Sequence, residues 1–157
     1  MPELPVSLDR LEGLCRRAGL ACKTNLETGE LAVLYRILDE DCPLYIAPDV
    51  GRGMVRFMMP LPFRVPPARL AFVADAVMRL NGAARMGGWV QALDAGEASF
   101  RVVLPTFGAD YTDDGLLFVV RLVVAAVNAA AADLRQIALG DRTSAELWPR
   151  AASVPCG

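Results

Sequence analysis

The sequence predicts an α+β protein with two layers, an antiparallel sheet of about five strands and three helices packed on one face of it. The predicted order is α-β-β-β-α-β-β-α. Two observations support this fold class. Apolar residues repeat at helical spacing in three segments, and they alternate with other residues in paired runs joined by turn sequences. One sheet with helices on one side buries both patterns in a single core.

The first predicted helix begins at Leu8 and is apolar on one side. Ser7 precedes it and is a favoured N-cap residue, and Gly19 is well placed to end it. The apolar positions of this helix are Leu8, Leu11, Leu14, Cys15 and Ala18.

Hairpins follow each of the first two predicted helices. Gly29 and Gly96 lie in short turn segments, where glycine allows the backbone to reverse. A further extended pair turns around residues 48–51, and one of its strands is short. The paired runs are residues 20–24 with 31–37, 44–47 with 53–59, and 89–93 with 98–104.

The second and third helices have clear boundary signals. Pro66 or Pro67 suits the first turn of the second helix, and Asn81-Gly82 is a stop signal. Thr112 or Asp113 caps the third helix, which runs to about Leu139 before Gly140. We expect one domain over residues 1–144 and a loosely ordered tail over residues 145–157.

The third helix is apolar on nearly every side up to Ala132. Arg121 and Asn128 interrupt the run, and charges at 133 and 135 shorten it, so we expect a core helix and no membrane span. Apolarity all round implies burial by the sheet and by a second subunit. The sequence therefore predicts a homodimer.

Composition disfavours most enzyme chemistry. The chain of 157 residues contains no histidine, so Ser-His-Asp and Cys-His catalysis lack their base, and Lys23 is its only lysine. The four cysteines are scattered, without the spacing of a zinc site. Two carboxylate clusters, at 39–41 and at 110, 113 and 114, have simpler roles at a strand end and a helix N-terminus. We expect no catalytic residue, no metal and no cofactor.

The N-terminal residues lack the pattern of a secretory signal, which predicts a cytoplasmic protein with reduced thiols. The formal net charge is −2 with both signs interspersed, so no long-range field attracts nucleic acid or an anionic membrane.

Strand alternation assigns one set of side chains to the face that the helices leave open. We assign the residues at 31, 33, 35 and 37, at 55, 57 and 59, and at 100, 102 and 104 to the face that the helices cover. Each of these three strands then shows one arginine on the other face, between small or apolar neighbours. Arginine and methionine are both favoured at adaptable interfaces. The predicted partner-binding residues are Leu34, Arg36, Met54, Arg56, Met58, Arg101 and Val103.

These arginines allow two other readings. A solvated sheet can simply carry one charge per strand. A nucleic acid strand is less favoured, because we expect no aromatic residue beside the arginines on that face and the overall balance is acidic. We also expect Arg36, Arg56 and Arg101 to form one row if their strands are neighbours in matching register.

The element order, together with Leu80-Asn81-Gly82, Trp89, residues 93–97 and the Ala-Ala-Ala-Asp-Leu stretch of the last long helix, resembles the YbjN-like bacterial proteins. Their fold is similar to that of type III secretion chaperones. The resemblance covers roughly residues 8–140. It implies a homodimer that holds a segment of another protein, with no cofactor and no turnover. This chain departs from many relatives in its proline-rich segment 60–67 and its nearly uninterrupted apolar third helix.

We therefore expect a non-enzymatic, chaperone-like or adaptor homodimer that binds another protein. One alternative is a small-molecule binding module with an apolar pocket between the sheet and the long helix. Another is an enzyme that uses the aspartates at 110–114.

Overall fold

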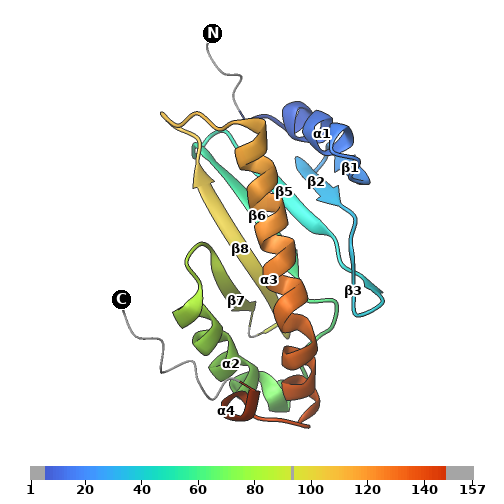
Figure 1. The fold of residues 1–157 in the computed structure, drawn as a ribbon, viewed down its shortest axis with the longest axis vertical. Helices are drawn as coiled ribbons and strands as arrows, with labels where there is room; N and C mark the ends of the chain where they lie inside the picture. The colour runs from blue at the N-terminus through green and yellow to red at the C-terminus, as the bar shows by residue number, and fades with distance from the viewer. Residues whose placement is uncertain (1–5, 93, 148–157) are drawn as a thin grey trace.

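A six-stranded antiparallel sheet forms the framework of the computed structural model, which describes residues 6–92 and 94–147 (Figure 1). The strand order is β1-β2-β5-β6-β8-β7. The predicted α+β class and antiparallel sheet are confirmed. The sheet has six strands instead of about five because both strands of the middle pair are long. The strands are β1 (Cys22–Asn25), β2 (Glu30–Val33), β5 (Leu44–Asp49), β6 (Met54–Pro60), β7 (Gly88–Ala92) and β8 (Glu97–Pro105).

The predicted strand over residues 31–37 ends early, at Val33. Val33 pairs with Leu44, the first residue of β5, so the chain must reverse between them and residues 34–37 have no partner on β5. This connection forms a separate small hairpin of β3 (Arg36–Ile37) and β4 (Glu40–Asp41).

The three longer helices lie where the sequence predicts them. They are α1 (Leu8–Arg17), α2 (Leu70–Ala83) and α3 (Asp113–Leu139). Ser7 caps α1 by accepting a hydrogen bond from the Arg10 amide, and Thr112 caps α3 in the same way. Gly140 ends α3 with a φ of 88°, a left-handed conformation that favours glycine.

α2 ends at Ala83, one residue after the predicted stop signal Asn81-Gly82. The sequence misses one helical feature. A short fourth helix, α4 (Ser144–Leu147), packs against α2, where the Ser144 hydroxyl donates to Asp75. Residues 145–147 of the predicted loose tail thus belong to α4, and residues 148–157 lie outside the described residues.

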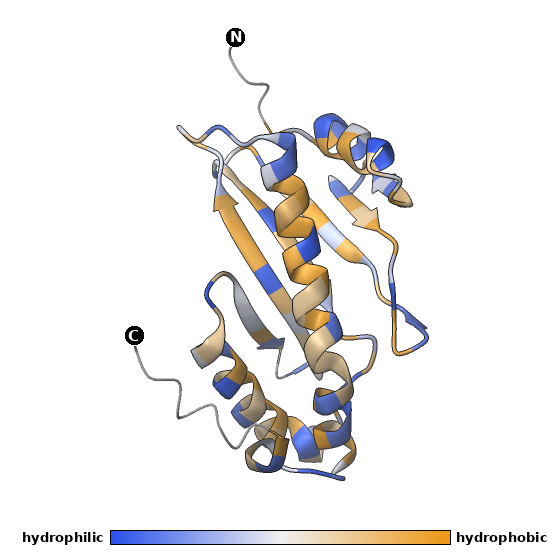
Figure 2. Cartoon of the chain, in the orientation of Figure 1, coloured by the Kyte–Doolittle hydropathy of each residue, from blue (hydrophilic) through white to orange (hydrophobic). Residues whose placement is uncertain are grey.

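The core lies between the sheet and α3, which crosses β5, β6 and β8 (Figure 1). α1 contacts β1 and β2, and α2 contacts β7. Apolar residues run along the length of α3, β6 and β8 (Figure 2). The predicted inward residues of β2, β6 and β8 are all buried, which confirms their parity. They are Leu31, Val33, Val55, Phe57, Met59, Phe100, Val102 and Leu104.

Candidate functional site

The side of the sheet opposite α3 carries the residues that sequence parity assigns to partner binding. Strand pairing places Tyr45, Met58 and Arg101 opposite one another across β5, β6 and β8. Ala47, Arg56 and Val103 form the next row, and Met54 follows on β6. We call these seven residues, Tyr45, Ala47, Met54, Arg56, Met58, Arg101 and Val103, the open face.

The structure brings together five of the seven predicted partner-binding residues. Leu34 and Arg36 lie outside the six-stranded sheet, so the predicted placement of Arg36 on its outward face is wrong. Leu34 follows the end of β2, and Arg36 lies in the β3–β4 hairpin, where it pairs with Asp41 at 3.7 Å. The reason is the early end of β2, which removes both residues from the sheet.

The expected single row of arginines is also absent. Arg56 lies opposite Val103, and Arg101 lies opposite Met58, so the two arginines are diagonal neighbours. Arg56 reaches past β5 to Glu30 on β2, with a nitrogen–oxygen distance of 3.0 Å. Arg101 is exposed and has no ion pair with another described residue. The open face therefore presents one paired and one unpaired cation.

Tyr45 is an open-face residue that the sequence reasoning missed. Leu44 and Ile46 are both fully buried, so strict alternation turns Tyr45 and Ala47 outward. Applying this parity to β5 would have found them. Tyr45 also corrects the expectation that no aromatic residue accompanies the arginines, because it shares a row with Arg101.

A hollow of about 560 Å³ adjoins the open face at the β1–β2 hairpin. Tyr45 and Ala32 belong to its wall, and Lys23 and Glu30 give it charges of both signs. Leu26, at the hairpin turn, is 84% exposed beside it. The open face, with its apolar side chains and two arginines, thus adjoins a depression. The hollow is lined by Lys23, Thr24, Asn25, Leu26, Glu27, Thr28, Glu30, Ala32 and Tyr45.

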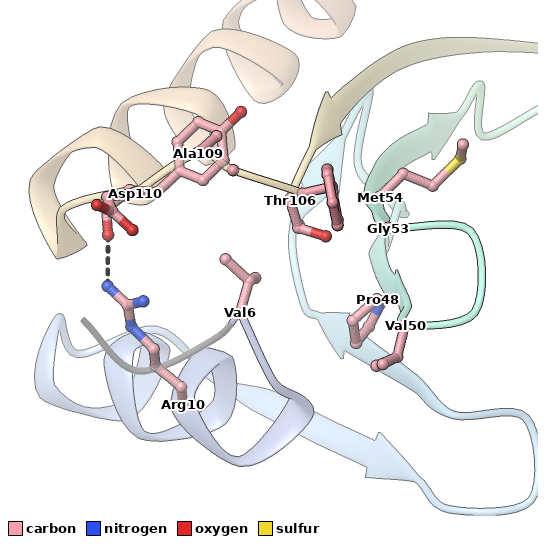
Figure 3. A pocket seen from close by; sticks show the side chains of 12 residues that line it. Val6, Arg10, Pro48, Val50, Gly53, Met54, Thr106, Ala109 and Asp110 are labelled. Atoms are coloured by element: carbon pink, nitrogen blue, oxygen red, sulfur yellow. Dashed lines mark hydrogen bonds between the residues drawn. The ribbon is translucent and has the colours of Figure 1, made fainter. Parts of the chain in front are cut away.

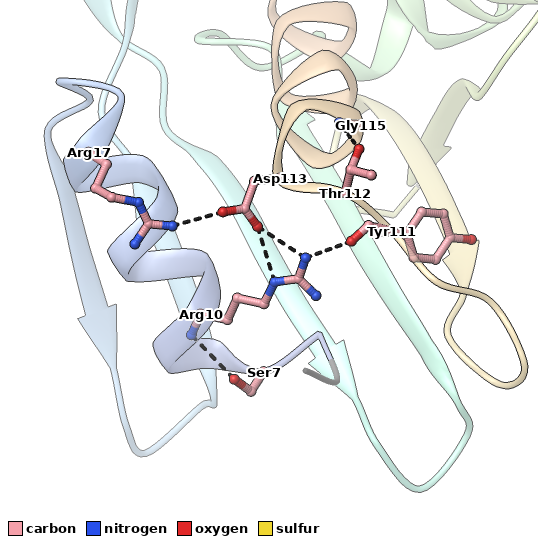
Figure 4. Close-up of polar contacts among 7 residues, drawn as sticks. All are labelled: Ser7, Arg10, Arg17, Tyr111, Thr112, Asp113 and Gly115. Atoms are coloured by element: carbon pink, nitrogen blue, oxygen red, sulfur yellow. Dashed lines mark hydrogen bonds and ion pairs between the residues drawn. The ribbon is translucent and has the colours of Figure 1, made fainter. Parts of the chain in front are cut away.

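The second predicted carboxylate cluster joins α1 to the N-terminus of α3 (Figure 4). Asp113 accepts hydrogen bonds from Arg10 at 3.0 Å and from Arg17 at 2.9 Å. The hydrogen bond from Arg10 is the main reason that the pKa of Asp113 is lowered, with Arg17 adding to it. Arg10 also donates to the carbonyl of Tyr111 at 2.6 Å. This aspartate therefore fastens two helices together.

Beside this network lies a smaller hollow of about 300 Å³ between the β5–β6 turn and residues 106–111 (Figure 3). Arg10 borders it on one side, and Val50 and Met54 border it on the other (Figure 3). Within the described part of the chain, no three His, Cys, Asp or Glu residues are grouped so that they could hold a metal ion.

The described cysteines are free thiols at Cys15, Cys22 and Cys42. Burial raises the pKa of Cys42 to about 11, and burial together with nearby Cys22 raises that of Cys15 to about 11. The Cys42 thiol donates to the carbonyl of Pro60 at 3.1 Å. Cys15 and Cys42 are therefore protonated core residues with little nucleophilic character at neutral pH.

α3 is long and apolar enough to cross a membrane by length and composition, but only 39% of its most apolar 18-residue window is buried in this fold. The core helix of a globular protein can have the same length and apolar composition. Because α3 contacts β5, β6 and β8, it covers one face of the sheet. On the side of α3 away from the sheet, Phe118 is 59% exposed and Leu139 is 65% exposed.

Comparison with known proteins identifies the family. A family described as "YbjN: Putative bacterial sensory transduction regulator" matches residues 7–136. This chain belongs to the YbjN family. The match runs from the cap of α1 through most of α3, so the whole open face lies inside the family region. The resemblance to YbjN-like proteins is thus confirmed at the level of the family.

Solved structures share the fold of this YbjN-family chain. The crystal structure of YbjN from E. coli, described as "a putative transcription regulator", has a TM-score of 0.61 at 14% identity and covers 85% of this chain and 93% of its own. A crystal structure of an uncharacterized protein from Methanothermobacter thermautotrophicus has a TM-score of 0.56 at 14% identity, covering 83% and 98%. No curated protein matches this chain. At this identity, the structural matches support a common fold alone.

Proposed function

We propose that this chain is a non-enzymatic regulator that holds a segment of another protein against its open face, as a chaperone or an adaptor does. The observation that carries the proposal is the location of Met54, Met58 and Val103 on the side of the sheet away from α3. Val103 is 43% exposed, and both methionines are half-buried. Such side chains gain from being covered by a partner.

The charges on the open face favour a partner of a particular chemistry. Arg101 lies opposite Met58, in the same row as Tyr45, and no described carboxylate forms an ion pair with it. A partner segment with apolar side chains and a carboxylate opposite Arg101 would satisfy both features. Arg56 already forms an ion pair with Glu30, so its charge is less available to a partner than that of Arg101.

The family description, a sensory transduction regulator, supports a binding role over a catalytic one. The raised thiol pKa values and the use of Asp113 between two helices point the same way. The alternative of an enzyme that uses the aspartates at 110–114 is disfavoured, because Asp113 is paired with Arg10 and Arg17.

We also propose that two copies associate through α3. Phe118, Ala125, Ala132 and Leu139 are all exposed and follow one another at seven-residue spacing. In an antiparallel pair of α3 helices, this stripe places Phe118 of one copy near Leu139 of the other and the alanines at the crossing. Heptad spacing keeps such a stripe facing its partner, and alanines allow close approach. The two proposed interfaces use opposite layers of the molecule and can be occupied together.

Affinity capture from the native host tests the open face. We expect the wild-type chain to retain a specific partner and Arg101→Glu with Val103→Glu to lose it. Arg36→Glu is the control for charge reversal, since it replaces an arginine by a glutamate away from the open face. Circular dichroism of each preparation reports on the fold. If the folded double variant captures the partner as well as wild type does, the open face is not the binding site.

Tyr45 favours a second candidate function, the binding of a single-stranded nucleic acid. A base could stack on Tyr45 while Arg101 and Lys23, in the same row, contact phosphates. The formal net charge of −2 and Glu30 on the neighbouring strand act against it. Fluorescence anisotropy with a labelled oligonucleotide distinguishes the two functions: salt-sensitive binding that Tyr45→Ala removes would favour nucleic acid.

A further inference from the structure

An apolar groove opens between α2, α3 and the β7–β8 hairpin, on the helix-covered side of the sheet. Its volume of about 390 Å³ falls within the range of small-molecule sites. It lies between the sheet and the long helix, where the sequence suggested a pocket. The groove is lined by Leu80, Ala83, Ala84, Arg85, Met86, Trp89, Phe100, Leu122, Ala126, Ala129 and Ala130.

Two aromatic rings belong to the groove and are held in place. Trp89 and Phe100 pair edge to face, with ring centroids 5.6 Å apart. The side chain of Asn81 forms hydrogen bonds with both backbone groups of Trp89. It accepts a hydrogen bond from the Trp89 amide at 2.6 Å and donates to the Trp89 carbonyl at 3.0 Å. This clamp also joins α2 to the edge strand, so the groove is preformed.

Small side chains of α3 keep the groove open. Ala126, Ala129 and Ala130 occupy its α3 wall, where larger residues would fill the space. In the turn before β7, Gly87 adopts a φ of 74°, and a Cβ there would lie 2.6 Å from Val102 Cγ2. The turn into β7 therefore requires glycine, and this turn brings Arg85 and Met86 to the rim.

Among the described residues that line the groove, Arg85 alone is charged. It is exposed and forms no ion pair with another described residue. The described part of the groove thus combines an apolar interior with one unpaired cation and without a carboxylate. This arrangement complements a molecule with an alkyl body and a single anionic end.

We propose that the groove binds a free, single-chain aliphatic carboxylate, with its alkyl chain along Trp89, Phe100 and Leu80 and its carboxylate at Arg85. A cationic or uncharged chain of the same length gains nothing from Arg85. This site is independent of the open face, which lies on the opposite side of the sheet, so either proposal can fail without the other.

Fluorescence quenching tests the site directly because Trp89 belongs to the groove. The chain has two tryptophans, so a Trp148→Phe background leaves Trp89 as the only emitter. The probe is 10-bromodecanoate, whose bromine quenches on contact, and 10-bromodecanol is its uncharged match. We expect saturable quenching by the acid below its micellar concentration, with about fivefold weaker binding of the alcohol, the scale of an exposed ion pair.

Two variants separate the charge from the cavity. Arg85→Gln should remove the preference for the acid over the alcohol, whereas Arg142→Gln, an exposed arginine outside the groove, should leave it unchanged. Ala126→Leu should weaken the binding of both probes, because the larger side chain fills the groove. Circular dichroism checks that this variant is folded. Quenching that does not saturate would overturn the proposal. So would an Arg85→Gln variant that prefers the acid over the alcohol as strongly as the chain with Arg85 does.

Discussion

Two turn glycines in the outer hairpins carry different steric constraints. Gly29 and Gly96 both have left-handed φ values, 68° and 63°. Nothing lies within 4 Å of a Cβ built at Gly29, whereas a Cβ at Gly96 would be 2.6 Å from the carbonyl oxygen of Val65. The Val65 amide donates to the Gly96 carbonyl at 2.7 Å, so the two segments cannot separate freely.

We therefore expect Gly29→Ala to lower the free energy of unfolding by about 1–2 kcal/mol, the usual cost of a left-handed L residue. Gly96→Ala should cost about 2–4 kcal/mol because overpacking is added to the same backbone penalty. Urea unfolding of both variants measures the difference. Equal losses would show that the Val65 contact adds no constraint.

Asp113 gives the stability of the chain a predictable pH dependence. The pKa of Asp113 is lowered in the folded state, chiefly by the hydrogen bond from Arg10, so its contribution is present above the unfolded-state pKa and is lost as pH falls through the folded-state pKa. We expect wild type to lose more unfolding free energy than Asp113→Asn between about pH 6 and about pH 3. Asp75, whose pKa is also lowered, remains in both proteins. Parallel pH profiles would contradict the assigned role of Asp113.

At the scale of elements, α3 determines both the core and the proposed self-association. The sequence alone predicts that Val124→Asp is severely disruptive whichever side it faces. The structure refines this expectation, because Val123 has 0% exposure whereas Val124 is half-buried at the edge of the core. We expect Val123→Asp to cost more than about 4 kcal/mol and Val124→Asp roughly half as much. Thermal melting of the pair checks this order, and its reversal would mean that α3 is rotated about its axis.

The exposed stripe of α3 leads to a separate prediction about assembly. Phe118→Glu with Leu139→Glu should weaken self-association by at least about tenfold, because both ends of the stripe become charged. Val50→Glu is the control, since Val50 is 86% exposed on the β5–β6 turn away from α3. Sedimentation velocity at micromolar concentrations measures the effect. A wild-type chain that stays monomeric as concentration rises would contradict the proposed dimer.

At the scale of the whole molecule, local patterns predicted the elements better than their connections. Alternation in β6 and β8 placed Met54, Met58 and Val103 on the correct side, because period-two parity is a local property. The place of Arg36 depends on where β2 loses its partner, which follows from the register of Val33 with Leu44. Pairing register is a long-range property that parity within one strand does not contain.

The ion pairs and the groove also depend on long-range contacts, which local sequence patterns do not predict. Arg56 meets Glu30, 26 residues away, and Arg10 meets Asp113, 103 residues away, so no local spacing predicted either contact. The groove depends on how Trp89 from β7 and Ala126 from α3 meet. The sequence suggested only that a pocket could lie between the sheet and the long helix.

The central claim is that the open face binds another protein while α3 binds a second copy. Photo-crosslinking in the native host tests both halves in one measurement, with benzoylphenylalanine at Val103 in one variant and at Phe118 in another. We expect Val103 to yield an adduct with a different protein and Phe118 to yield an adduct of twice the chain mass. An adduct with another protein at Phe118 only, with none at Val103, would contradict the account.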